Sequence, residues 1–301
     1  MKPIIQECSP QLEIIADYGC ETGENPLWHV QEQRLYWTDI PTGRLFRYDP
    51  SNGKHEQIYQ GRPVGGFTFE ADGGLLLFRD RGNVALWREG KVVEIVDEIA
   101  EERESRFNDV IADPVGRVFC GTMSSESSKG RLYRLDLDGR IAQILESVGC
   151  SNGMGFSPDL RTFYHTDSFA GEIYRFDYRI ENGFLSNRRT FATIPESEGL
   201  PDGLAVDQDG GVWSALWDGS GLIRLDQGGN VAMRVRFPTR KVSSLTFGGV
   251  NLRDIYATTA GGDRKQENGA AAGSLFRLRL NAVGRPEFPS RVASKTGIVD
   301  Q

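Results

Sequence analysis

Short apolar and aromatic stretches alternate with polar turns along the whole chain, and one tripeptide pattern marks this alternation six times. Each copy has an aliphatic residue, then usually an aromatic residue, then arginine. The copies are Leu45-Phe46-Arg47, Leu86-Trp87-Arg88, Leu132-Tyr133-Arg134, Ile173-Tyr174-Arg175, Leu222-Ile223-Arg224 and Leu275-Phe276-Arg277. Successive copies lie roughly 40 to 50 residues apart, which is too far for one hairpin and typical of one propeller blade. The pattern therefore predicts six repeated units.

A β-rich stretch precedes each tripeptide. These stretches are Leu35–Trp37, Leu76–Phe78, Val118–Cys120, Thr162–Tyr164, Val212–Ser214 and Ile255–Ala257. Turns such as Ala71–Gly74 and Asp113–Gly116 come before them, and such turns end strands because Gly and Asn tolerate positive φ and Pro lacks a backbone donor. Another turn and a weaker strand, such as Ile141–Leu145, follow each tripeptide. Four short strands in each of six units predict an all-β fold, a six-bladed β-propeller.

The same repetition bears on domain organisation. A chain of 301 residues is long enough for two domains, but no linker-like or low-complexity segment divides it. We therefore expect a single propeller domain over residues 1–301. The N-terminal stretch Leu12–Ile15 resembles a fourth strand without the first three, so we expect it to complete the last blade and close the ring.

Charge and cysteine content restrict the possible partners and location. The net charge is −7 and no run of basic residues occurs, which argues against nucleic acid or an anionic membrane as a partner. No apolar run reaches transmembrane length. The four cysteines show no CxxC pairing, so we interpret them as reduced, mostly buried thiols in a cytoplasmic protein, with disulfides as the alternative.

The repeat also indicates a site. Aligning the six units on the residue that opens the innermost strand gives a ring of positions. These positions are Glu24, Gly65, Asn108, Asn152, Asp202 and Ser243. Because the first strand of every propeller blade lines the central channel, the acid and amide side chains of this ring converge near the axis at one face. Carboxylate and amide oxygens are the ligands that hard cations prefer, so the ring predicts a cage for a divalent ion.

A simpler interpretation exists for single members of the ring. Asn and Asp before Gly are common turn residues that hydrogen-bond their own backbone, and Asn152-Gly153 or Asp202-Gly203 alone indicates only a turn. Both residues, however, occupy equivalent positions in their repeats, and so does Glu24, which has no turn propensity. The three together therefore favour a functional ring over three unrelated turns. Arg106 and Glu126 lie in loops that reach the same face, but spacing alone favours solvated loop charges for both.

Other site chemistries find no support in the sequence. The three histidines show no HExxH or Cys–His spacing for zinc, and no GxSxG nucleophile elbow occurs. The glycine pairs do not form GxGxxG between a strand and a helix, so we expect no nucleotide cofactor.

Four segments together resemble the hallmark segments of the regucalcin (senescence marker protein)/gluconolactonase family. These segments are Glu24-Asn25-Pro26-Leu27-Trp28, Arg106-Phe107-Asn108-Asp109 followed by Gly121-Thr122-Met123, Ser151-Asn152-Gly153, and Pro201-Asp202-Gly203. The similarity spans roughly Glu13 to Leu280. Asn25 stands where many members have Gly, and Val110 where Gly often follows the Asn-Asp pair; neither change removes a liganding atom, so they bear on substrate preference.

The resemblance implies a six-bladed propeller with one catalytic divalent metal at the channel mouth. It implies metal ligation by Glu24, Asn152 and Asp202, with Asp202 also the general base. Arg106, Asn108 and Glu126 would contact the substrate, a small-molecule sugar lactone that is hydrolysed to the aldonic acid. The metal could be calcium, magnesium, manganese, zinc or iron(II), since the ligand atoms do not select among them.

Two other functions stay open from the sequence. The same cage would suit a calcium-binding regulatory protein of the regucalcin type without catalysis, and a propeller face can also be an interaction platform for a peptide. The sugar of the lactone is not readable from the sequence, and a monomer is the default expectation.

Overall fold

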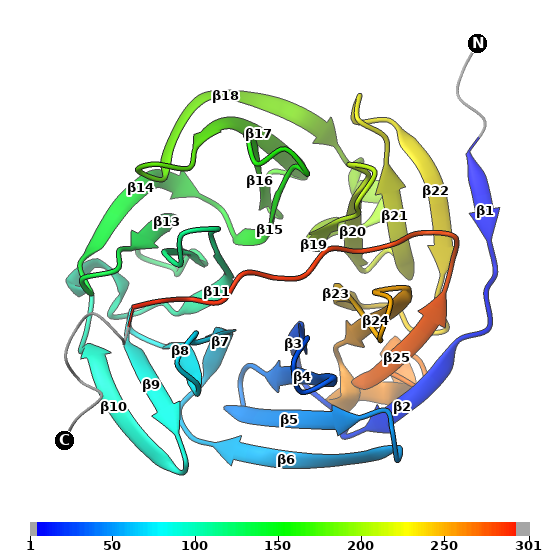
Figure 1. Ribbon diagram of the computed structural model, residues 1–301. Coiled ribbons are helices and arrows are strands. Elements are labelled where there is room, and N and C mark those ends of the chain that lie inside the picture. The colour runs from blue at the N-terminus through cyan, green and yellow to red at the C-terminus, as the bar shows by residue number, and fades with distance from the viewer. Residues whose placement is uncertain (1–4, 293–301) are drawn as a thin grey trace.

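The structure is a computed structural model that describes residues 5–292, and it places six sheets radially around a central axis (Figure 1). Each blade has four antiparallel strands, numbered outward from the axis. Blade 1 contains β3 (Gly23–His29), β4 (Arg34–Asp39), β5 (Arg44–Asp49) and β6 (Lys54–Gln60). Blade 2 contains β7 (Val64–Phe69), β8 (Leu75–Arg79), β9 (Val84–Arg88) and β10 (Lys91–Val96). Blade 3 contains β11 (Phe107–Ala112), β12 (Val118–Thr122), β13 (Gly130–Leu135) and β14 (Ile141–Val148).

Blades 4 to 6 repeat this order, and the last blade takes its outermost strand from the N-terminal part of the chain. Blade 4 contains β15 (Ser151–Phe156), β16 (Thr162–Asp167), β17 (Glu172–Arg179) and β18 (Phe184–Thr193). Blade 5 contains β19 (Leu200–Val206), β20 (Val212–Trp217), β21 (Gly221–Leu225) and β22 (Val231–Arg236). Blade 6 contains β23 (Val242–Gly248), β24 (Asp254–Thr259), β25 (Ser274–Arg279) and β2 (Glu13–Asp17). The predicted all-β, six-bladed β-propeller is confirmed.

The N-terminal part of the chain closes the ring. Strand β2 pairs antiparallel with β25, with Glu13 opposite Arg277, and the Arg277 guanidinium donates to the Glu13 carboxylate at 2.5 Å. Strand β1 (Gln6–Cys8) runs parallel to β22 and adds a fifth strand to blade 5. Segments from the two ends of the chain are therefore joined in blade 6, which ties the first and last blades together.

Helical structure is short throughout the described residues. It consists of η1 (Ala100–Glu102), η2 (Glu196–Glu198), η3 (Gly262–Arg264) and α1 (Lys265–Asn268). Within residues 5–292, none of these helices has the length and apolar character that a membrane crossing requires. The four cysteines are free thiols, and Cys20, Cys120 and Cys150 are buried, in agreement with the expected reduced state.

Leu45 and Phe46 of β5 show why the tripeptide recurs. Both are fully buried, but successive strand residues point to opposite faces of a sheet. Leu45 packs in the cluster that contains Val64 of blade 2, whereas Phe46 packs in the cluster that contains Tyr256 of blade 6. Arg47 follows with an ion pair to the outer strand β6. Each tripeptide thus contributes to the two interfaces on either side of its own blade.

The C-terminal segment (residues 280–292) crosses the middle of the disc (Figure 1, red). Its backbone bonds to loops that join first and second strands: Gly284 N donates to Leu252 O at 2.8 Å, and Arg291 N donates to Gly116 O at 2.9 Å. Because those loops follow the inner strands, this segment covers the channel end opposite to the one where the inner strands begin. The channel therefore has an open end and a covered end.

Candidate active site

A cavity of about 300 Å³ lies at the open end, where the inner strands begin. Its lining combines polar and apolar side chains from blades 1, 3, 4 and 5. They are Thr22, Glu24, Ile40, Arg106, Asn108, Met123, Cys150, Asn152, Ser168, Phe169, Leu200, Asp202 and Trp217. Every site residue predicted from the sequence is in this set except Glu126. Glu24 and Asp202, which lie 178 positions apart in the sequence, thus meet in one cavity.

A register shift interrupts each inner strand beside its ring residue. The shifts lie between Glu24 and Leu27, Val64 and Gly66, Phe107 and Asp109, Asn152 and Met154, Pro201 and Leu204, and Val242 and Ser244. Such a bulge breaks the in–out alternation and bends the strand, which re-aims a side chain near the strand's start. The bulges therefore position the ring, and the glycines after Asn152 and Asp202 are their sequence signal.

Two ring positions are used for packing. A Cβ on Gly65 would lie 1.9 Å from the carbonyl oxygen of Phe107, so only glycine fits where β7 and β11 approach each other. The Ser243 hydroxyl donates a hydrogen bond to the carbonyl of Gly23 in the neighbouring blade. Neither residue lines the cavity, which leaves Glu24, Asn108, Asn152 and Asp202 as the ring members that do.

The carboxyl groups of Glu24 and Asp202 are both buried, with 4% of each residue exposed. Burial raises the pKa of both groups well above the ordinary values. The negative charges of Asp202 and Asp109 add to the rise at Glu24, and the charge of Asp109 adds to the rise at Asp202. Neither forms an ion pair with a basic side chain of the described residues. The positive charge of Arg106 opposes this rise at both groups, and a bound cation would favour their ionised forms further.

The donor set fits a divalent cation. Glu24 and Asp202 offer carboxylate oxygens, and the amide of Asn152 adds a neutral oxygen donor. Within residues 5–292, no group of three or more acidic, histidine or cysteine side chains is placed to hold a metal. Three protein ligands would leave coordination positions open for water and substrate, as in catalytic metal sites. Oxygen-only ligation suits calcium, magnesium or manganese best.

Ser168 fixes the amide of Asn152, and sequence reasoning missed it. Asn152 Nδ2 donates to Ser168 Oγ at 3.1 Å, and Ser168 Oγ donates to the carbonyl oxygen of Pro201 at 2.6 Å. With its nitrogen held in this way, the amide has one defined orientation. The only sequence signal for Ser168 is its place directly after β16, at a strand end that returns to the open end.

Arg106 and Asn108 form one hydrogen-bonded unit in the cavity wall. Arg106 Nη1 donates to Asn108 Oδ1 at 2.7 Å and to Phe107 O at 2.9 Å. Asn108 Nδ2 donates in turn to Ser151 O in blade 4 at 3.0 Å. Desolvation lowers the pKa of Arg106, while the charges of Cys150, Glu24 and Asp202 act in the opposite direction. A guanidinium stays protonated at neutral pH, so a fixed cation faces the two carboxylates.

Glu126 lies apart from this group. It is exposed in the loop between β12 and β13, and it does not line the cavity. The apolar part of the wall was not predicted as such: Phe169 stands at the rim with 59% of its surface exposed, and Trp217 lies beneath the Lys241 ammonium at 4.3 Å. These two rings add apolar surface to the cavity wall.

Comparison with known proteins agrees with this architecture. A family model described as SMP-30/Gluconolactonase/LRE-like region matches residues 22–261. Pentonolactonase XacC of Haloferax volcanii is 46% identical over 293 residues, which cover 92% of this chain and 97% of the relative. Regucalcin of Bos taurus is 31% identical over 295 residues, which cover 93% of this chain and 98% of the relative.

Among solved structures, a calcium-binding protein, regucalcin, from Agrobacterium tumefaciens aligns with a TM-score of 0.88. The alignment covers 96% of this chain and 99% of that protein at 20% sequence identity, so it shows a shared fold. Together these matches confirm the family resemblance predicted from the four sequence segments.

Proposed function

The chain belongs to the SMP-30/gluconolactonase/LRE-like family, and from that premise we propose that it is a divalent-metal-dependent lactonase. It would hydrolyse a sugar-acid (aldono) lactone to the open aldonic acid. The observation that carries this proposal is the convergence of Glu24, Asn152 and Asp202 in one cavity with Arg106 and Asn108. A relative of 46% identity is named a pentonolactonase, which favours a five-carbon lactone as the substrate.

Glu24, Asn152 and Asp202 would hold the cation. When bound, it supplies Lewis-acid polarisation of the lactone carbonyl and lowers the pKa of water. Asp202 would act as the general base: its carboxylate accepts a proton from the attacking water, whose oxygen forms a bond to the carbonyl carbon. When the bond from that carbon to the ring oxygen breaks, Asp202 returns the proton to the ring oxygen.

Arg106 and Asn108 would orient the substrate. The guanidinium of Arg106 is held by Asn108 Oδ1 and Phe107 O, so its remaining donors point in a defined direction for lactone oxygens. Such orientation before the chemical step contributes to rate because less freedom is lost in the transition state. Glu126 would be a contact at the rim, reached from the β12–β13 loop.

An assay of several aldonolactones with a pH indicator tests the proposal. Pentonolactones and hexonolactones are compared after chelation and after adding back Ca²⁺, Mg²⁺, Mn²⁺, Zn²⁺ or Fe²⁺ one at a time. We expect turnover only with added metal, and faster turnover of a pentonolactone. Full activity in the chelated protein, or no hydrolysis of any lactone with any of the metals, contradicts the proposal.

A calcium-binding role without catalysis is the second candidate, because several similar proteins are named regucalcin and the one from Agrobacterium tumefaciens is described as calcium-binding. The same oxygen donors would bind calcium whether or not water is activated. Calcium binding with no lactone turnover in the assay would favour this role. We further propose a monomer that acts in the cytoplasm, which analytical ultracentrifugation and cell fractionation would test.

A further inference from the structure

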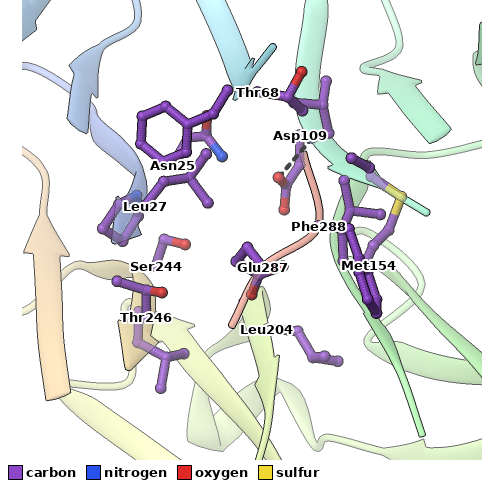
Figure 2. A pocket seen from close by; sticks show the side chains of 16 residues that line it. Asn25, Leu27, Thr68, Asp109, Met154, Leu204, Ser244, Thr246, Glu287 and Phe288 are labelled. Atoms are coloured by element: carbon purple, nitrogen blue, oxygen red, sulfur yellow. Dashed lines mark hydrogen bonds between the residues drawn. The ribbon is translucent and has the colours of Figure 1, made fainter. Parts of the chain in front are cut away.

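The covered end of the channel holds a second, smaller cavity of about 40 Å³ (Figure 2). It lies farther along the inner strands than the candidate active site, beneath the C-terminal segment. Its wall includes two acidic side chains, Asp109 of β11 and Glu287 of the C-terminal segment, and two hydroxyl side chains, Ser244 and Thr246 of β23. None of these four residues takes part in the proposed lactone hydrolysis.

Asp109 lines this cavity, whereas Asn108, the residue before it, lines the cavity at the open end. A register shift in β11 lies between Phe107 and Asp109. Asp109 is 8% exposed, and its Oδ1 accepts a hydrogen bond from Val110 N at 2.7 Å. Figure 2 shows its carboxylate on the same side of the cavity as the C-terminal segment, which carries Glu287.

The two carboxyl groups have no cationic partner at contact distance. Neither forms an ion pair with a basic side chain of residues 5–292, although the charge of Arg285 acts on Glu287 from a distance. Burial raises the pKa of both groups to about 7, and the charge of Glu287 adds to the rise at Asp109. Two buried acids in a small cavity are unfavourable when ionised unless a positive charge lies between them.

The two hydroxyls point independently to a ligand. Ser244 and Thr246 are only 6% and 3% exposed, and neither side chain forms a hydrogen bond with the rest of the described chain. In Figure 2 the hydroxyl oxygens of both residues face the cavity, toward Glu287. A hydroxyl at a cavity wall that bonds to no other protein group has its hydrogen-bonding capacity available for a ligand in that cavity.

We propose that Asp109, Glu287, Ser244 and Thr246 form a second cation site, separate from the candidate active site. All four donors are oxygens, two of them anionic, and the space is sufficient for one ion and little else. A set of carboxylate and hydroxyl oxygens suits Ca²⁺, which accepts irregular coordination, better than Mg²⁺, which demands regular octahedral geometry. An ion there joins blade 3, blade 6 and the C-terminal segment, so its effect would be on stability.

Calcium stoichiometry tests this site. We expect the wild-type protein to bind two Ca²⁺ ions in isothermal titration calorimetry at about pH 8, where proton competition is weak. Glu287→Gln keeps the shape of the side chain and should bind one ion while retaining lactonase activity. Asp202→Asn should lose the ion at the open end and retain the other. Equal numbers of bound ions in the wild type and in Glu287→Gln overturn the proposal.

A second measurement does not depend on any variant. Wild-type crystals grown with Mn²⁺ should show an anomalous peak between Asp109 and Glu287, and no peak there overturns the proposal. Glu146→Gln, which changes an exposed glutamate on β14, is the matched control and should bind two ions. Because lactonase activity is measured separately from ion count, failure of this proposal is distinguishable from failure of the lactonase proposal.

Discussion

The two ends of the channel are built from the same inner strands but suit different ligands. At the open end, a cavity of about 300 Å³ sets two carboxylates against a guanidinium and an apolar wall, which suits a cation together with an organic molecule. At the covered end, about 40 Å³ remains between two carboxylates and two hydroxyls, which suits an ion alone. Asn108 and Asp109, neighbours in sequence, line opposite cavities. A bulge in each inner strand therefore lets one repeat present two rings of side chains.

Asp202→Asn should show the largest difference between the two ends. Loss of the proposed general base and of one proposed anionic ligand should lower kcat/KM for the lactone by roughly 10²–10⁴-fold, while the circular dichroism spectrum stays unchanged. Steady-state kinetics at saturating metal measures this effect. Asp209→Asn, an exposed acid in a turn of the same blade, is the control. Turnover within a few-fold of wild type would remove Asp202 from the mechanism.

Arg106→Lys should have the next largest effect. Lysine keeps the charge but cannot donate to Asn108 Oδ1 and Phe107 O while it also reaches the substrate. We expect kcat/KM to fall by roughly 10-fold or more, as expected for lost orientation, with no change in the calcium bound at either end. Arg236→Lys, at an exposed arginine of β22, should leave the kinetics unchanged.

Ser168→Ala should act on the metal at the open end. Without the Ser168 hydroxyl, Asn152 Nδ2 loses its hydrogen-bond partner and the amide is free to rotate. Outer-shell changes of this kind reduce metal affinity by roughly 10–100-fold. Titration of the chelated protein with metal, followed by activity, measures the shift. At saturating metal the activity should recover, which distinguishes lost affinity from lost chemistry.

The covered end predicts a pH effect on stability. Without metal, the pKa of Asp109 and of Glu287 is about 7 in the folded protein, above the ordinary values of 3.8 and 4.5. The folded state then holds more protons than the unfolded state. The two protonated carboxyl groups therefore contribute to the free energy of unfolding at low pH, and this contribution is lost as pH rises through about 7. The melting temperature of the chelated protein should fall by at least ~2 °C between about pH 5 and about pH 8.

Glu287→Gln isolates the part of this fall that comes from the covered end. Glu24 and Asp202 also have raised pKa values and contribute in the same direction, but they remain in the variant. The fall should therefore be smaller in Glu287→Gln than in the wild type. Saturating Ca²⁺ should reduce it in the wild type, since a bound cation favours the ionised carboxylates. Identical melting curves for the two proteins would contradict the assignment.

The spacing of the repeat in the sequence was enough to predict the six blades and the positions at which their inner strands begin. Six units in phase were enough to bring Glu24, Asn152 and Asp202 to one end of the axis, because each opens an inner strand. The placement of Asn108 and Asp109 in two different cavities was not predictable, because the sequence does not show the register shift between Phe107 and Asp109. Glu287 belongs to a segment outside the repeat, so no phase assigns it to the channel.

Glu126→Gln should have the smallest effect on activity. It tests a residue that the repeat does not place at the site. The family resemblance implies that Glu126 contacts the substrate, yet its loop follows no period and the side chain is exposed, away from the cavity. A hydrogen bond to substrate from so exposed a group is worth roughly 1 kcal/mol, so kcat/KM should change by less than about 10-fold, mostly through KM. A loss comparable to that of Asp202→Asn would mean that the β12–β13 loop moves onto the open end when the lactone binds, and that the cavity described above is only part of the site.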